Sequence, residues 1–193
     1  GKIGGTDVVA TYSGVCKVNA AIAAQILIDS FTVSAVINSG TAGAIDKKLN
    51  LFDTVIATEC CYHDVADDIL TEFHPWMKNV FFESSPYLLE KSKIAVKKAG
   101  LANVSFGRMV TGEAFITDDG REKIVRKFAP LSVDMETAAV AHVCYANRIP
   151  FLSVRCITDT AEHSGIGNFD KNSAKAFGKA ELLRLEREHR VLN

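Results

Sequence analysis

Short runs of β-branched and apolar residues alternate along this chain with stretches of helical periodicity, and this alternation constrains the fold most. The pattern is typical of strands joined by crossover helices. Two runs, residues 33–37 (VSAVI) and 151–154 (FLSV), are almost continuously apolar, as expected of strands covered on both faces. The sequence therefore predicts an α/β fold: a three-layer α/β/α sandwich with a mainly parallel central sheet.

The periodicity also locates the individual elements. We expect strands at residues 7–11, 33–38, 54–58, 104–110 and 151–157. We expect helices at residues 18–31, 86–99, 119–128 and 136–147. In the first of these helices the apolar residues recur with a period near 3.6, so we expect their shared face to pack on the sheet. These residues are Val18, Ala21, Ile22 and Ile26.

Composition limits the possible classes of protein. The chain has 193 residues, 48% of them hydrophobic and 23% charged, and no repeat or linker divides it, so we expect a single domain over residues 1–193. Lys and Arg number 22 against 23 Asp and Glu, which leaves no cationic excess for a nucleic-acid partner. Because no apolar run reaches about 18 residues, we expect no membrane span and a cytoplasmic protein.

Five cysteines are scattered along the chain without the paired spacing of a zinc site. Cys60 and Cys61 precede His63, but no matching pair of ligands follows them. We therefore expect reduced, mostly buried thiols, no metal site and no cofactor.

Residues 62–85 have weak periodicity and carry several aromatic side chains, among them Phe73 and Trp76. We expect a loop-rich excursion. A loop of this composition either closes a site or meets a partner.

Ligands of open α/β sheets bind beyond the carboxyl ends of the strands, and four such ends carry informative residues. They are residues 38–43, 110–116, 132–139 and 155–161. Each also has an ordinary structural interpretation: a tight turn, a core Phe beside a solvated Glu, acids that complement a helix dipole, and an Asp that caps a helix. No single segment shows whether its residues have a structural role or a role in binding and catalysis.

Together, these segments resemble a known family. Residues 133–145 (VDMETAAVAHVCY) and 149–159 (IPFLSVRCITD) are similar to the signature of the 5'-methylthioadenosine/S-adenosylhomocysteine nucleosidases. Residues 37–43 (INSGTAG) and 111–116 (TGEAFI) resemble two further segments of that family, in the same order and spacing. The resemblance covers residues 1–159 and implies the phosphorylase/hydrolase-like α/β/α sandwich.

The resemblance implies hydrolysis of the N-glycosidic bond of 5'-methylthioadenosine and S-adenosylhomocysteine, which releases adenine and a 5-thioribose sugar. Such a reaction belongs to methionine salvage and the recycling of adenosylmethionine by-products. It needs a proton donor for the leaving adenine and a stabilising group for the oxocarbenium-like sugar, and a carboxyl group can meet each need.

The same resemblance assigns roles to individual residues. Asp159 is implied as the acid that protonates adenine N7, and Glu136 as the carboxylate that holds the ribose hydroxyls. Arg155 is implied either to organise Glu136 or the neighbouring loop, or to form a simple salt bridge.

The remaining substrate-binding residues follow from the same comparison. Met135 is implied to line the ribose and alkylthio side, Phe115 to stack on the purine, and the Ile116 backbone to read the purine edge. Ala42 and Gly43 are implied to lie under the site, where a larger side chain would collide with the ligand.

In the resembling family a neighbouring subunit closes the alkylthio pocket with an aromatic residue. The aromatic excursion is also too apolar to lie bare on a small protein. We therefore expect a homodimer in which Phe73 reaches into the partner's site.

Several positions depart from the family pattern. Cys16 stands where a second small Gly is usual, and Asp134 and Glu113 replace the usual Glu and Asp. Residues 178–193 are rich in Glu and Arg, unlike the apolar closing helix of the family. Related enzymes also have an additional strand before the position of Gly1, whose following loop supplies the glutamate that activates water. We therefore expect a domain truncated at its N-terminus, with poor hydrolysis by the 193-residue chain alone.

Two alternatives stay open at this point. A purine-nucleoside phosphorylase would share the fold but needs cationic or hydroxyl groups around a phosphate, and residues 39–43 contain no Arg or Lys. A non-catalytic or impaired nucleoside-binding protein would retain Phe115, Glu136 and Asp159 without the glutamate that activates water.

Overall fold

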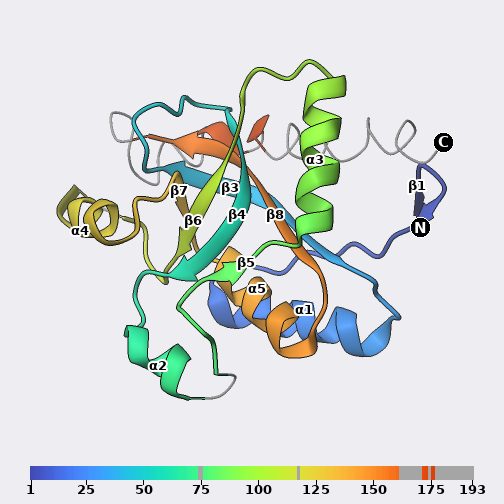
Figure 1. Ribbon diagram of the computed structural model, residues 1–193. Coiled ribbons are helices and arrows are strands. Elements are labelled where there is room, and N and C mark those ends of the chain that lie inside the picture. The colour runs from blue at the N-terminus through green and yellow to red at the C-terminus, as the bar shows by residue number, and fades with distance from the viewer. Residues whose placement is uncertain (74–75, 117, 161–170, 174, 177–193) are drawn as a thin grey trace.

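The structure is a computed structural model that describes residues 1–73, 76–116, 118–160, 171–173 and 175–176 (Figure 1). The expectation for residues 178–193 lies outside the described residues, as does the expected strand before Gly1.

Eight strands and five helices are present in the described ranges. The strands are β1 (Lys2–Ile3), β2 (Thr6–Asp7), β3 (Val36–Ala44), β4 (Thr54–Tyr62), β5 (Phe82–Glu83), β6 (Val104–Thr111), β7 (Ser132–Asp134) and β8 (Phe151–Asp159). The helices are α1 (Lys17–Ser30), α2 (Asp67–Glu72), α3 (Pro86–Lys98), α4 (Asp118–Phe128) and α5 (Thr137–Asn147).

The central sheet has six strands in the order β5-β4-β6-β7-β3-β8. Its two longest ladders, β3 with β8 and β4 with β6, are parallel, whereas β7 on β3 and β5 on β4 are antiparallel. β8 also pairs antiparallel with β4, so that five strands close into a ring. The sheet is thus mixed, and its long parallel pairs bring several carboxyl ends of strands to one region.

Helices cover the sheet from different sides. α1 and α5 lie side by side beneath it, whereas α3 runs along β8 and α4 lies at the opposite edge (Figure 1). Local sequence sets some of these helix ends: Ser85 caps α3 by accepting a hydrogen bond from the Leu88 amide, and Pro86 takes the first helical position. This arrangement is consistent with the three-layer α/β/α sandwich expected from the sequence.

The prediction that the apolar stripe of α1 packs on the sheet is wrong. Val18, Ile22 and Ile26 are 67%, 53% and 56% exposed, and the helix is buried through Ala20 and Ala24 instead. The small alanine side chains allow a close approach of the backbone, so the larger apolar residues of the stripe point outward.

Two other expectations need correction. The expected strand at 7–11 is replaced by β2 (Thr6–Asp7), which overlaps that range only at Asp7 and pairs with β1 in a separate two-stranded sheet. Residues 9–15 line a cavity instead. The aromatic excursion at 62–85 contains the short helix α2 and the strand β5, which extends the edge of the main sheet.

The five cysteines are free thiols. Cys60, Cys61, Cys144 and Cys156 are buried, while Cys16 is partly exposed. Burial raises the pKa of Cys61 and of Cys144 to about 12, which keeps both thiols protonated and unreactive at neutral pH. None of the helices in the described ranges is long and apolar enough to cross a lipid bilayer.

Candidate active site

A cavity of about 500 Å³ opens beside the carboxyl ends of β3 and β8. Segment 9–15, α1, the loop after β6 and the entry to α5 supply its other walls. The structure gathers most of the residues predicted from the sequence in this one place. Those that line the cavity are Ala42, Gly43, Phe115, Ile116, Met135, Glu136, Arg155 and Asp159.

Asp159 is the last residue of β8 and lies opposite Gly43 in the parallel pairing with β3. Thr158 donates a hydrogen bond of 3.0 Å from its Oγ1 to Asp159 Oδ1. Burial raises the pKa of Asp159, while the Thr158 hydrogen bond and the Arg121 charge oppose that rise. A carboxyl group with a raised pKa at a cavity wall is suited to donate a proton.

Gly43 is close to the Asp159 carboxylate. A Cβ atom at position 43 would lie 2.6 Å from Asp159 Oδ2, so a side chain there would displace the acid itself. From the family resemblance we expected a larger residue here to collide with a ligand. In this structure the first collision is with Asp159.

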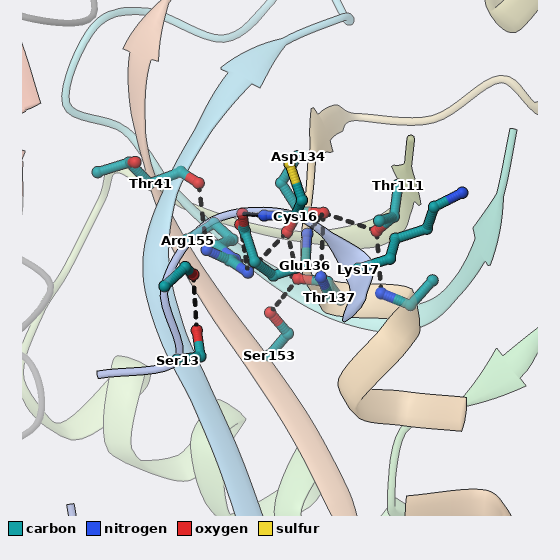
Figure 2. A network of polar contacts seen from close by, with 12 residues as sticks. Ser13, Cys16, Lys17, Thr41, Thr111, Asp134, Glu136, Thr137, Ser153 and Arg155 are labelled. Atoms are coloured by element: carbon teal, nitrogen blue, oxygen red, sulfur yellow. Dashed lines mark hydrogen bonds and ion pairs between the residues drawn. The ribbon is translucent and has the colours of Figure 1, made fainter. Parts of the chain in front are cut away.

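Glu136 lies at the entry to α5 on the same cavity. The Cys16 amide donates a hydrogen bond of 3.0 Å to its Oε1, and Arg155 Nη2 lies 3.6 Å from its Oε2 (Figure 2). Burial raises the pKa of Glu136, and the nearby Asp134 charge adds to that effect, while Arg155 works against it. The carboxylate is therefore held in place by a backbone donor and a buried cation.

Arg155 is the cation that organises this wall. Its side chain is 5% exposed, and its Nη2 lies 2.9 Å from Asp134 Oδ2 as well as near Glu136. Its Nε donates to Thr137 Oγ1 at 3.1 Å, and its Nη1 donates to the Thr41 carbonyl at 3.3 Å. Arg155 thus joins β3, β7 and α5, which goes beyond a simple salt bridge with one partner.

Asp134 is the buried acceptor at the centre of the network in Figure 2. Thr111 donates to its Oδ1 at 2.6 Å, the Thr137 hydroxyl donates to its Oδ2, and the Thr137 amide donates to its Oδ1 at 3.1 Å. The carboxylate therefore fixes the first turn of α5 against the end of β6. In the sequence, Asp134 stood out as a departure from the family pattern and as one of the acids at a helix entry that can complement the helix dipole. Its place at the start of a helix was a signal for a capping role.

The loop after β6 supplies the apolar side of the cavity. Phe115 is 45% exposed at this wall, and Ile116 and Met135 are half-buried. An aromatic ring beside apolar side chains offers a stacking surface for a planar base.

Phe73 is not brought together with these residues. It follows α2, is 58% exposed and lies outside the cavity lining of the described chain.

Comparison with known proteins agrees with this geometry. The sequence model of the phosphorylase superfamily matches residues 1–187. A 5'-methylthioadenosine/S-adenosylhomocysteine nucleosidase of Shewanella sp. (strain MR-7) is 36% identical over 190 residues, which cover 95% of this chain and 79% of the relative. The chain belongs to this nucleosidase family.

Two other members of the nucleosidase family are also similar to this chain. The enzyme of Staphylococcus aureus (strain JH9) is 38% identical over 176 residues, covering 88% of this chain and 76% of the relative. The solved structure of the S. pneumoniae nucleosidase with a transition-state inhibitor has a TM-score of 0.87 and 30% identity, and the match covers 100% of this chain and 85% of that one.

The structure also places two residues at the site that were not predicted from the sequence. Arg121 on α4 lines the cavity and donates a hydrogen bond of 2.7 Å to the Ala44 carbonyl. The Cys16 amide holds Glu136 because Cys16 adopts a φ of 76° at the start of α1, a conformation that favours glycine. In the described part of the chain, no three His, Cys, Asp or Glu side chains cluster in a way that could hold a metal ion.

Proposed function

We propose that this chain hydrolyses the N-glycosidic bond of 5'-methylthioadenosine and S-adenosylhomocysteine, releasing adenine and a 5-thioribose sugar. The observation that carries the proposal is the placement of two partly buried carboxyl groups, Asp159 and Glu136, on one cavity whose other wall carries Phe115. The names of the family relatives supply the chemical identity of the nucleoside.

Asp159 is the proposed general acid. Burial raises its pKa, which favours the protonated form at the end of β8, where the leaving base would lie. Protonation of adenine N7 makes the purine a better leaving group, and general acid catalysis of this kind is worth about 10²- to 10⁴-fold in rate.

Glu136 is the proposed ligand of the ribose hydroxyls. Its two oxygens face different partners, the Cys16 amide and the Arg155 guanidinium, which fix the orientation of the carboxylate. A fixed negative charge beside the sugar stabilises the positive charge that develops in an oxocarbenium-like transition state. Arg155 acts here as a positioning residue, because it also holds Asp134.

Phe115 is proposed to stack on the purine, while the Ile116 backbone reads the purine edge and Met135 lines the ribose and alkylthio side. All three residues lie on the cavity wall. Ala42 and Gly43 contribute the narrow floor, and Gly43 leaves room for the Asp159 carboxyl.

Water is the proposed acceptor of the sugar in place of phosphate. The cations on the described part of the cavity wall are Arg121 and Arg155. Arg121 already donates to the Ala44 carbonyl, and Arg155 is bound to two carboxylates. These contacts favour hydrolysis over phosphorolysis.

We also propose a homodimer in the cytoplasm. Phe73 and Trp76 are 58% and 64% exposed, which supports an apolar surface that a second copy covers. Phe73 is the proposed contribution of each subunit to its partner's alkylthio pocket. The free thiols of all five cysteines suit a reducing compartment.

The function is tested by following adenine release from 5'-methylthioadenosine in buffer with and without phosphate. The proposal predicts release that does not depend on phosphate, together with free methylthioribose as the sugar product. Release that requires phosphate and yields a sugar phosphate would show a phosphorylase instead.

A further inference from the structure

Three residues from separate elements meet just outside the cavity wall. Lys17 is the first residue of α1, Asp64 follows β4, and Glu113 follows β6. Lys17 Nζ lies 3.0 Å from both Asp64 oxygens, the Lys17 amide donates to Glu113 Oε1 at 3.0 Å, and the Glu113 amide donates to Asp64 Oδ2 at 2.9 Å. We call these three residues the Lys17 cluster.

Within the Lys17 cluster, the pair of Lys17 and Asp64 is more enclosed than a surface ion pair. The side chains of Lys17 and Asp64 are 19% and 29% exposed, against 48% and 54% for the surface pair of Lys127 and Asp67. Burial, the largest single effect, works to raise the pKa of Asp64, yet its pKa is lowered because the contacts with Lys17 and the Glu113 amide outweigh burial. Asp64 is therefore a charged acceptor held in a defined place.

The cluster connects the two halves of the proposed substrate site. Glu113 lies two residues before Phe115, in the loop that forms the apolar wall. The amide of Cys16, next to Lys17 in the chain, holds Glu136 (Figure 2). Two consecutive amides at the start of α1 thus bind a carboxylate on the sugar side and a carboxylate on the purine side, both at 3.0 Å.

We infer that Lys17 and Asp64 are positioning residues that fix the purine-binding loop, residues 112–116, at a set distance from Glu136. The inference rests on the proposed function, because it takes Phe115 as the purine-stacking residue. Neither side chain belongs to the described lining of the cavity, so both act through Glu113.

Loss of the Lys17 ammonium leaves the Asp64 carboxylate with the Glu113 amide but without its cation. The loop then samples more conformations. Because the Phe115 ring must be ordered when the purine binds, the affinity for the purine falls. Asp159 lies on β8, where it accepts a hydrogen bond from Thr158 and lies against Gly43. We therefore expect kcat, which reports proton donation at saturating substrate, to change little.

The test compares Lys17→Met, Lys17→Arg and Asp64→Asn with the wild-type chain. Adenine binding is measured by calorimetric titration, and KM and kcat are measured by adenine release from 5'-methylthioadenosine. We expect Lys17→Met to weaken adenine binding and to raise KM by about fivefold or more, while kcat stays within about twofold. Lys17→Arg restores affinity because a guanidinium can contact both Asp64 oxygens.

Lys127→Met is the matched control, since it removes the ammonium of an ion pair whose two residues are not part of the described cavity lining. It is expected to leave adenine affinity unchanged. The double variant Lys17→Met with Asp64→Asn is expected to lose no more affinity than the weaker-binding single variant, because both act through one contact. A thermal melt of each variant separates loss of positioning from loss of folding.

Equal adenine affinity in the wild type and in folded Lys17→Met would overturn the inference, as would loss of kcat without loss of affinity. A wild-type chain that binds adenine but releases none from the nucleoside would contradict the proposed function instead. The titration then still decides the role of Lys17, because it needs no turnover.

Discussion

The Asp159 carboxylate occupies the space that a side chain on Gly43 would need. The two residues face each other across the parallel pair β3 and β8, where the register shifts between Ala42 and Gly43. The irregular end of this ladder therefore places a partly buried acid directly against a backbone that has no Cβ. A side chain at position 43 would therefore displace the acid, whether or not a ligand is bound.

Gly43→Ala is expected to displace Asp159 and to lower kcat by about tenfold to 10²-fold, because a new Cβ would lie 2.6 Å from Oδ2. Adenine release gives the rate. Gly1→Ala is the control, since a Cβ there would meet no atom within 4 Å. Normal turnover in Gly43→Ala would show that the acid is not held against this glycine.

Arg121→Gln is expected to move the basic limb of the pH profile of kcat/KM to higher pH. The general acid must be protonated, so activity falls as pH rises through the pKa of Asp159. Burial raises that pKa and the Arg121 charge lowers it, so removal of the charge raises it further. Lys123→Gln removes an exposed charge from the same helix and should leave the limb in place. A shift to lower pH in Arg121→Gln would contradict this assignment.

Arg155→Met is expected to destabilise the fold by about 3 to 5 kcal/mol, because the Asp134 carboxylate would stay buried without its cation. Urea unfolding measures the loss. Arg155→Lys keeps the charge but not the forked contacts with Thr137 and Thr41, so we expect an intermediate loss. An unfolding free energy of Arg155→Met within about 0.5 kcal/mol of the wild type would remove Arg155 from the centre of the network.

Sedimentation is expected to show a homodimer at micromolar concentration. Phe73 and Trp76 are exposed, and the outward stripe of α1 adds Ile22. Trp76→Glu should weaken the dimer through desolvation of a charge. Ile94→Glu, an equivalent change on α3, should not. A monomer with full activity would contradict the proposed assembly.

The sequence indicates that residues at the ends of the predicted strands lie together, because the carboxyl ends of parallel strands converge. The roles of these residues were implied by the family resemblance. Ala42, Gly43 and Asp159 come together through the ladder of β3 and β8. The apolar runs indicated these two strands but not their pairing. The position of Glu136 at the entry to the helix 136–147 also fits an acid that complements the helix dipole, and its role at the site was implied by the family resemblance.

Side-chain contacts between distant elements could not be predicted in this way. Lys17 meets Asp64 and Glu113 only because α1, β4 and β6 end at one place, and no local pattern signals that meeting. Periodicity also failed to orient α1, since Ala20 and Ala24 allow closer packing than the larger apolar stripe.

The central claim is that Asp159 protonates the purine as water displaces it. The most direct test measures adenine release from 5'-methylthioadenosine by the wild-type chain and by Asp159→Asn in phosphate-free buffer, with nucleoside binding titrated in parallel. We predict release by the wild type, a decrease of about 10²-fold or more in the variant, and nearly unchanged binding. Equal rates of release from the two proteins, or no release by the wild type until phosphate is added, would contradict the account.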